Sequence, residues 1–442
     1  MRLGTPSSHD GAFGAAENLI AELHGADRAV MSVTGSSGSN QAVLLMLSRL
    51  APDATVLVAR NAHHSTIHAL MAFGVGFEFL PAGYDTTFGA LLPPSPQEVA
   101  RALERRPDAR AVLLTSPTYE GLAARVGEIA EVVRAGDPDR LLVVDEAWGA
   151  HLAFHEQLPT PAVQQGADIV IQSTHKQGGS LQQTGIILWR ETRVDSALMA
   201  EAHEHWQTTS PSFHLLASID AAHRELAVDG RDLIAASIER TDRLNTLVAE
   251  RLPGLERFVT PERLEALSDR VDGFDRTKTT FALTAYGRRG HELSDRLIDA
   301  HGVTLETAGL NTIMFLFPFQ LPERAEERAV DALVAELEGE LAEPGTPPRL
   351  PSDPFATLSS APDSDPSAAS RAAYRDGVTL DVTEAIGRIS AAAVEAIPPG
   401  IPVLLPGFRV TREAVEYLRE VRSCGGKVTG VDPGVTQLRV LP

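Results

Sequence analysis

The sequence contains a single cysteine, Cys424, among 442 residues. An intrachain disulfide is therefore impossible, nothing resembles a cysteine metal site, and a reducing compartment fits this composition. Positive charge is also scarce, because 39 Lys and Arg residues stand against 59 Asp and Glu residues and give a formal net charge of -20. Such a charge opposes binding to nucleic acid or to anionic lipid over most of the surface. We expect a small-molecule substrate, with no nucleic acid and no membrane as partner.

Long apolar runs are missing too. No stretch reaches the roughly 18 uninterrupted apolar residues of a membrane span, and the first residues, MRLGTPSSHDGAFG, lack the basic and apolar regions of a secretion signal. These absences predict a cytoplasmic protein. Hydrophobic residues make up 43% of the chain and charged residues 22%, which is an ordinary globular composition. A chain of this length is expected to form about two to three domains.

Short apolar runs alternate with helical patterns from Ala12 to about Val194. This alternation predicts an α/β fold with a mainly parallel sheet covered by helices. The predicted strands are residues 55–59, 77–80, 111–115, 141–145, 168–172 and 185–189, and the predicted helices are residues 40–50, 96–106 and 215–250.

A second unit follows, with a predicted strand at 280–286, a helix at 293–300 and a strand at 312–317. Residues 343–370 are rich in Pro, Ser and Asp without an apolar period, which indicates a linker or a loop on the surface. Beyond it we predict a helix at 380–396, a strand within 398–407 and a helix at 412–423. The resulting division is a major domain (1–230), a small α/β subdomain (231–342), a linker (343–372) and a C-terminal α+β domain (373–442).

The segment QSTHK, residues 172–176, follows the apolar run at 167–171. Lys176 therefore lies where a parallel strand ends, which is where α/β sheets place their chemistry. An amine there, with Ser173 three residues before it and His175 beside it, suits a Schiff base with pyridoxal phosphate whose phosphate is held by these neighbours. The alternative is a solvated lysine beside a turn.

The segment TGSSGSNQ, residues 34–41, runs into a predicted helix. Free backbone N–H groups and the helix dipole at such a place favour a phosphate. An ordinary loop with a serine N-cap explains the same residues equally well.

Histidines gather in RNAHHSTIHA, residues 60–69, directly after a predicted strand. We expect the imidazole of His63 to stack on the cofactor ring, His64 to make a surface or neighbouring contact, and His68 to serve packing only. A metal site is the competing hypothesis, but no carboxylate or cysteine joins these histidines at ligand spacing, so we predict no metal.

An aspartate ends the apolar run in VVDEAWGAH, residues 143–151. Asp145 can there pair with a protonated pyridine nitrogen. Strand alternation directs Glu146 to the opposite side, which indicates a structural role. Trp148 and His151 either line the site or pack the following turn.

These segments, together with SPTYEG at 116–121 and TTSPSF at 208–213, resemble the major domain of the Orn/Lys/Arg decarboxylases. DRTK at 275–278, GVTLETAG at 302–309, EAIGRI at 384–389 and PPGIPVLLPG at 398–407 resemble that family's second and C-terminal domains. The resemblance spans nearly the whole chain in order, and it is to the compact type without an N-terminal wing domain. It implies the fold type I, aspartate aminotransferase-like architecture of pyridoxal phosphate enzymes.

The resemblance also implies residue roles. Lys176 forms the Schiff base, Asp145 pairs with the ring nitrogen, His63 stacks on the ring, and Lys176 or His175 delivers a proton to the α-carbon. Thr209 or Ser210 reaches the phosphate of the neighbouring subunit, which implies a homodimer with sites at its interface. The implied cofactor-binding residues are Ser36, Ser37, His63, Asp145, Ala147, Trp148, Ser173, His175, Lys176, Thr209 and Ser210.

The implied reaction is decarboxylation of arginine, lysine or ornithine to the amine, as in polyamine metabolism. Two positions depart from the family pattern: Phe408 replaces the glutamate of the usual PGE, and Ile397 replaces the usual tyrosine before PPGIP. The sequence also starts after the place of a proline, glycine, histidine segment that precedes the equivalent of Gly4. Another reaction of the same cofactor (aminotransferase, lyase or oxygen-using enzyme) and an inactive cofactor-binding homologue remain the alternatives.

Overall fold

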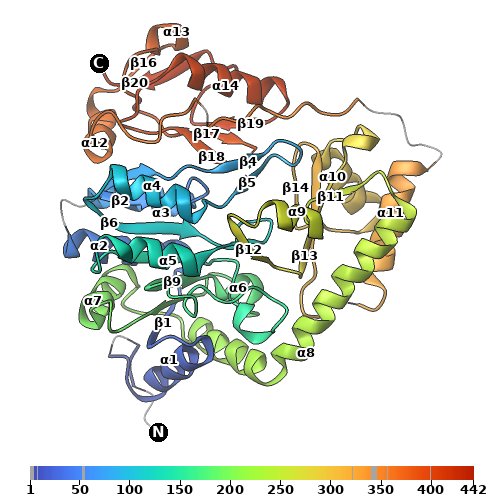
Figure 1. The fold of residues 1–442 in the computed structure, drawn as a ribbon, viewed down its shortest axis with the longest axis horizontal. Helices are drawn as coiled ribbons and strands as arrows, with labels where there is room; N and C mark the ends of the chain where they lie inside the picture. The colour runs from blue at the N-terminus through green and yellow to red at the C-terminus, as the bar shows by residue number, and fades with distance from the viewer. Residues whose placement is uncertain are drawn as a thin grey trace.

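The structure is a computed structural model that describes residues 4–6, 8–51, 55–320, 322–339, 346–355, 357–398 and 400–442. Figure 1 shows a major domain built on a central sheet, a smaller unit beside it, and a C-terminal domain over one end of the major domain. The described residues contain no helix that is both long and apolar enough to cross a membrane.

The central sheet of the major domain has seven strands in the order β1-β10-β9-β8-β6-β2-β3. Their bounds are β1 Arg28–Ser32, β2 Thr55–Val58, β3 Gly76–Phe79, β6 Ala109–Thr115, β8 Leu141–Asp145, β9 Ile169–Gln172 and β10 Gly185–Trp189. The strands from β9 to β3 are parallel, whereas β10 is antiparallel to both β9 and β1. The mainly parallel sheet and its six predicted strands are confirmed; β1 is an additional strand that the sequence did not suggest.

Helices cover both faces of this sheet, which explains why its strands are continuous apolar runs. Successive side chains point to opposite faces, so Val170 of β9 packs in one core cluster and Ile169 and Ile171 pack in the other. One cluster is shared with α1 (Gly11–His24), α4 (Pro96–Arg105) and α5 (Val126–Ala135), and the other with α2 (Gly35–Leu50), α3 (His64–Phe73) and α7 (Ser196–Trp206). The helices predicted at 40–50 and 96–106 are α2 and α4.

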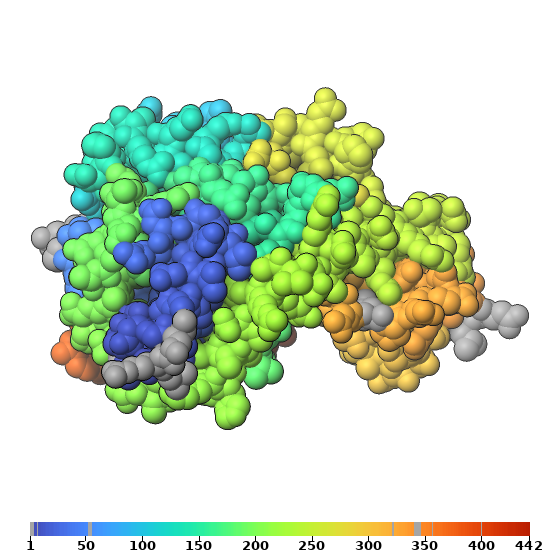
Figure 2. All heavy atoms as spheres, turned by 90° about the horizontal axis from the view of Figure 1, so that it is seen from below, coloured from blue at the N-terminus to red at the C-terminus, as the bar shows by residue number. Residues whose placement is uncertain are grey.

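The helix predicted at 215–250 is α8, which spans Phe213–Arg251 without interruption. Leu216 and Ile219 near its start pack in the core of the major domain, while Leu244 and Val248 near its end pack in the core of the small subdomain. In Figure 2 its yellow-green residues run across the lower surface from one unit to the other. The predicted domain boundary after residue 230 thus falls inside this helix.

The small subdomain has an antiparallel sheet in the order β11-β13-β15-β14. Its elements are β11 Glu256–Arg257, α9 Pro261–Ala266, β13 Lys278–Ala282, α10 Gly290–His301, β14 Thr307–Ala308, β15 Thr312–Leu316 and α11 Ala325–Glu338. The strand predicted at 280–286 ends at Ala282, and a short 3-10 turn at Thr284–Tyr286 follows it. The short pair of β7 (Leu122–Ala124) and β12 (Val271–Phe274) connects the major domain to the small subdomain. Strands β4 (Gly83–Asp85) and β5 (Ala90–Leu92) form a hairpin within the major domain.

The C-terminal domain corrects two predictions. The predicted helix at 380–396 is wrong: β16 (Val378–Asp381), the one-turn α13 (Val382–Ala385) and β17 (Val394–Ile397) occupy this stretch. Gly387 has a φ of 89°, a left-handed conformation that interrupts any helix there. The predicted linker is also too long at its end, because α12 (Pro366–Asp376) begins inside it, with Asp365 accepting a hydrogen bond from the N–H of Ser367. Residues 340–345 lie outside the described residues.

The rest of this domain follows the prediction. The strand within 398–407 is β18 (Ile401–Leu404) and the helix at 412–423 is α14 (Arg412–Ser423). Strands β17, β18 and β19 (Lys427–Thr429) form one antiparallel sheet, and β16 pairs with β20 (Gln437–Val440). Figure 1 shows β17 and β18 directly over the major domain, beside β4.

Candidate active site

A cavity of about 750 Å³ lies at the carboxyl ends of the strands of the central sheet. Segments that follow β1, β2, β6, β8 and β9 line it, and residues of the C-terminal domain complete its wall. Nine of the eleven residues predicted to bind the cofactor line this cavity: Ser36, Ser37, His63, Asp145, Ala147, Trp148, Ser173, His175 and Lys176. Thr209 and Ser210 do not; they line a separate hollow together with His203 and Phe213.

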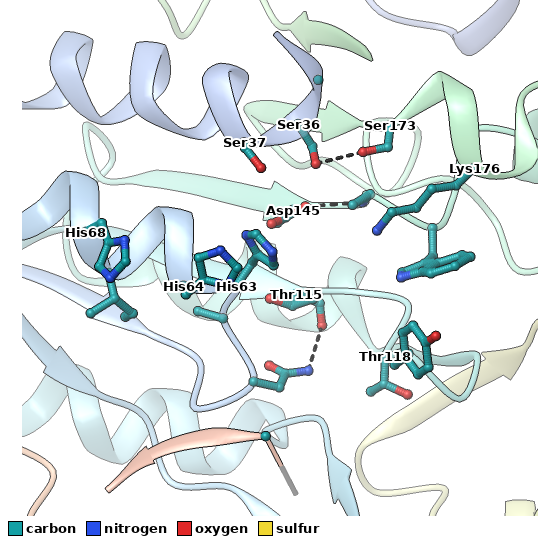
Figure 3. Close-up of a pocket in the computed structure, with 18 of the residues that line it drawn as sticks. Ser36, Ser37, His63, His64, His68, Thr115, Thr118, Asp145, Ser173 and Lys176 are labelled. Carbon is teal, nitrogen blue, oxygen red and sulfur yellow. Dashed lines mark hydrogen bonds between the residues drawn. The ribbon is translucent and has the colours of Figure 1, made fainter. Parts of the chain in front are cut away.

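Lys176 lies on α6 (Thr174–Gln177), the single helical turn that follows β9. Its side chain points into the cavity (Figure 3), and its Nζ is 4.2 Å from the ring centroid of Trp148. Burial lowers the pKa of Lys176, Asp145 opposes that effect, and the positive charge of Lys278 adds to it. A lowered pKa increases the fraction of neutral amine, which is the nucleophilic form.

Asp145 is the last residue of β8 and is buried beneath the cavity. Its Oδ2 accepts a hydrogen bond of 2.9 Å from Asn40 Nδ2, and its Oδ1 accepts one of 3.2 Å from the N–H of Ala147. Burial raises the pKa of Asp145, while Asn40, the charge of Lys176 and the Ala147 N–H counteract that rise. The carboxylate is thus oriented toward the cavity in a setting where a cationic partner would stabilise its charge.

Asn40 is a functional candidate that the sequence did not reveal. It lies in α2 four residues after Ser36, so both side chains project from the same face of this helix. The signal available in the sequence was a polar residue one helical turn after a helix start that is rich in Gly and Ser.

The segment at residues 34–41, expected to favour a phosphate at a helix start, contains the first turn of α2, which begins at Gly35. Gly35 has a φ of 64°, and the Oγ of Ser173 donates a hydrogen bond of 2.7 Å to the Oγ of Ser36 (Figure 3). At Gly185 a Cβ atom would lie 2.8 Å from the carbonyl oxygen of Gln172 and 3.1 Å from the nitrogen of Ser36. Glycine therefore allows β10 to approach the start of this helix closely, where N–H groups and hydroxyls meet.

His63 caps the N-terminus of α3, where its Nδ1 accepts a hydrogen bond of 3.2 Å from the N–H of Ser65. Desolvation, together with the charges of His64, Lys176 and His68, lowers the pKa of His63 to about 4, so the ring is neutral near pH 7. His64 and His68 also line the cavity. The expectation that His68 only packs is therefore wrong, because α3 lies along the cavity wall.

Glu146 and His151 have buried partners away from the cavity. Glu146 accepts hydrogen bonds from the N–H of Ala162 and from Gln172 Nε2, as its predicted structural role requires. His151 lies 3.2 Å from Asp275 and 3.3 Å from Gln177, within a buried polar network rather than in the cavity wall. Trp148, unlike His151, lines the cavity.

The C-terminal domain closes one side of the cavity through Ala393, Glu395, Gly400, Pro402 and Leu405. Phe408, at the position where the family resemblance leads one to expect an acid, is absent from this wall.

Phe408 is instead buried against the rings of Phe77 and Phe79, with centroids 6.2 and 6.1 Å away. The substitution thus adds to the core between two domains. Within the part of the chain that the structure describes, no group of three or more His, Cys, Asp or Glu side chains is arranged to hold a metal ion.

Comparison with known families agrees with this arrangement over most of the chain. The model of the Orn/Lys/Arg decarboxylase major domain matches residues 1–324, and that of the Orn/Lys/Arg decarboxylase C-terminal domain matches residues 350–439. The chain belongs to the Orn/Lys/Arg decarboxylase family. It is therefore an enzyme, an amino-acid decarboxylase by family.

Two arginine decarboxylases are similar in sequence to this chain along nearly its full length. An arginine decarboxylase of Halalkalibacterium halodurans is 33% identical over 431 residues, covering 96% of this chain and 84% of that protein. An arginine decarboxylase of Bacillus subtilis is 31% identical over 432 residues with the same coverage.

Among solved structures, the constitutive lysine decarboxylase of Escherichia coli aligns over 100% of this chain and 74% of its own, with a TM-score of 0.82 and 22% identity. The Bacillus subtilis ureidoglycine-glyoxylate aminotransferase aligns over 74% of this chain with a TM-score of 0.58 and 14% identity. These likenesses show the fold, which is the fold type I architecture of pyridoxal phosphate enzymes.

Proposed function

We propose that this family member decarboxylates a basic amino acid (arginine, lysine or ornithine) to the corresponding amine, using pyridoxal phosphate bound through Lys176. The observation that carries the proposal is the convergence of Lys176, Asp145 and the first turn of α2 on one cavity at the strand ends. The named relatives support the reaction class, since they are an arginine decarboxylase and a lysine decarboxylase.

The residues present fit the cofactor. Asp145 is a buried carboxylate whose orientation is fixed by Asn40, and such a group suits a protonated ring nitrogen. Ser36, Ser37, Ser173 and His175 stand at the helix start, where they would hold the phosphate. When bound, pyridoxal phosphate supplies the electron sink that accepts the electron pair left by departing carbon dioxide.

The chain's own residues would bind the cofactor, orient it, and protonate the α-carbon of the substrate. Lys176 holds the cofactor through its amine, and the neutral ring of His63 offers a flat face for stacking. His175 Nδ1 lies 2.7 Å from the carbonyl oxygen of Thr184, which can only accept, so Nδ1 carries the proton and donates this hydrogen bond. His175 or Lys176 would deliver the proton that the α-carbon receives after carbon dioxide leaves.

We also propose a cytoplasmic homodimer. Thr209 and Ser210 lie between α7 and α8, outside the cavity of their own chain. In the proposed dimer they reach the phosphate of the partner subunit, as the family resemblance implies.

The test is a panel of amino acids supplied to purified protein with pyridoxal phosphate, in which released carbon dioxide is scored against keto acid. Arginine, lysine or ornithine is expected to release carbon dioxide, and the visible absorbance band of lysine-bound cofactor is expected to disappear in Lys176→Ala. Keto acid without carbon dioxide would replace the proposal with an aminotransferase. Cofactor binding without any turnover of the panel would favour the inactive homologue.

A further inference from the structure

Glu395 of the C-terminal domain projects into the cavity because of the alternation along β17. Val394 and Ala396 are buried in the core of that domain, so the residue between them points to the opposite face of the strand. That face lines the cavity through Glu395 and through Pro402, its partner on β18. In Figure 3 the orange-red ribbon of this domain lies across the cavity from Ser36 and Ser173. Glu395 thus belongs to the wall opposite the predicted phosphate site.

Among the described residues, three carboxylates line the cavity, and the side chains of two of them have hydrogen-bond partners. Asp145 accepts hydrogen bonds from Asn40 and Ala147. Glu120 is hydrogen-bonded to Thr118 and lies near the charge of Lys278. For Glu395 we find no hydrogen bond or ion pair to its side chain from any residue that the structure describes. An acid at a cavity wall without a cationic partner is well placed to bind a cation that enters the cavity.

The other acid that a substrate cation could have used is missing. Phe408 stands where the resemblance led us to expect a glutamate, and its ring is packed against Phe77 and Phe79 outside the cavity. Glu395 is the one carboxylate that the described part of the C-terminal domain contributes to the cavity wall.

We propose that Glu395 binds the terminal ammonium or guanidinium group of the substrate side chain and so selects basic amino acids. This inference rests on the proposed function for the reaction itself. The amino acid would then lie with its reacting end at Lys176 and its cationic end at the C-terminal domain. A neutral or acidic side chain would leave the carboxylate without a partner, at a cost in affinity.

The experiment compares Glu395→Gln with Glu416→Gln, which removes the same charge from an exposed position of α14 in the same domain. Two readouts are needed. The first is KM and kcat for arginine, lysine and ornithine. The second is direct binding, by ligand-detected NMR, of n-pentylamine and n-butylguanidine, which carry the side-chain cation without the reacting α-carbon, with n-pentanol as the neutral comparator. Both proteins are assayed with their full complement of pyridoxal phosphate.

We expect Glu395→Gln to raise KM for the basic amino acids roughly tenfold or more, since a hydrogen bond to a charged group is lost. Binding of the two cationic probes should weaken to the same extent, while Glu416→Gln should leave both readouts at wild-type values. Equal probe binding by wild type and Glu395→Gln, or no preference of wild type for the cations over pentanol, would overturn the assignment. If the amino-acid panel yields no carbon dioxide but Glu395 still determines probe binding, then the proposed function fails and the cation site stands.

Discussion

Lys176 and Lys278 place their Nζ atoms 4.2 and 4.3 Å, respectively, from the centroid of one indole ring, that of Trp148. Two amines share one aromatic ring, although only Lys176 lines the cavity. Lys278 is fully buried, donates to the carbonyl oxygen of Tyr119 at 3.2 Å and lies 3.8 Å from Asp275. A fixed positive charge therefore stands behind the ring that the reactive lysine contacts.

Removing that charge should change the titration of Lys176. We expect Lys278→Met to raise the pKa of Lys176, because the repulsion from the Lys278 charge now helps to lower it. The measurement is the rate at which an amine reagent modifies Lys176 in cofactor-free protein at a series of pH values, followed by peptide mass spectrometry. Lys278→Arg keeps the charge and is the control; an unshifted profile in Lys278→Met would contradict the electrostatic role.

Asn40 should matter for cofactor affinity more than for stability. Asn40→Ala removes the donor that orients the Asp145 carboxylate, and we expect the affinity for pyridoxal phosphate to fall roughly tenfold. Equilibrium dialysis with the free cofactor measures this directly. Ser48→Ala, on the same helix outside the cavity, is the control. Wild-type affinity in Asn40→Ala would show that Asp145 needs no such donor.

Glu146 should make stability depend on pH. Burial raises its pKa to about 8, against hydrogen bonds from Ala162 and Gln172. The folded protein then keeps a proton that the unfolded chain releases above its ordinary pKa of 4.5, so Glu146 costs stability as pH rises through this window, at about 1.4 kcal/mol per unit.

Glu146→Gln removes this titration. The Tm of the variant relative to wild type should increase from pH 5.5 to about pH 8 and level off above that pH, when both are followed by thermal denaturation from pH 5.5 to pH 9. A constant difference across that range would mean that Glu146 is ionised in the folded protein at the lower pH as well.

Phe408 should behave as a core residue and not as a substrate contact. Phe408→Ala opens a space beside Phe77 and Phe79 and should cost about 3–5 kcal/mol, whereas Phe408→Leu should cost less. Thermal denaturation gives the loss of stability, and steady-state kinetics on Phe408→Leu should give an unchanged KM. A change in KM without a change in Tm would reverse this interpretation.

The proposed dimer predicts complementation between two inactive chains. Lys176→Ala lacks the reactive amine, and the double variant Thr209→Ala, Ser210→Ala would lack the groups that reach the partner's phosphate. Unfolding and refolding the two variants together should create mixed dimers with one intact site, so activity should reappear that neither variant has alone. If the mixture stays at the level of the separate variants, Thr209 and Ser210 do not act across an interface.

The major domain could be predicted well because its strands are buried on both faces. Such strands are continuous apolar runs between helical patterns, and the residues that follow them, such as Asp145 and Lys176, are then assigned to one edge of the sheet. The same reasoning fails for residues 380–396, where short elements are held in place by pairing with later strands: β16 pairs with β20, and β17 pairs with β18 and β19. Asn40 was missed for a similar reason, since its partner lies 105 positions away. Glu395 gave no signal, because only the alternation of β17 in the folded domain directs it to the cavity.

The wall of the cavity is contributed by two domains of the chain. Lys176 and Asp145 come from the major domain, whereas Pro402 and Leu405 come from the C-terminal domain, far later in the sequence. A chain emerging from the ribosome therefore contains Lys176 long before it contains the residues that close the cavity. The same separation lets evolution alter the hairpin of β17 and β18, and with it the shape offered to a substrate, while the reactive groups stay fixed. Under the proposed function, exchanging that hairpin between relatives would change the wall of the cavity that faces the substrate and leave Lys176 and Asp145 in place.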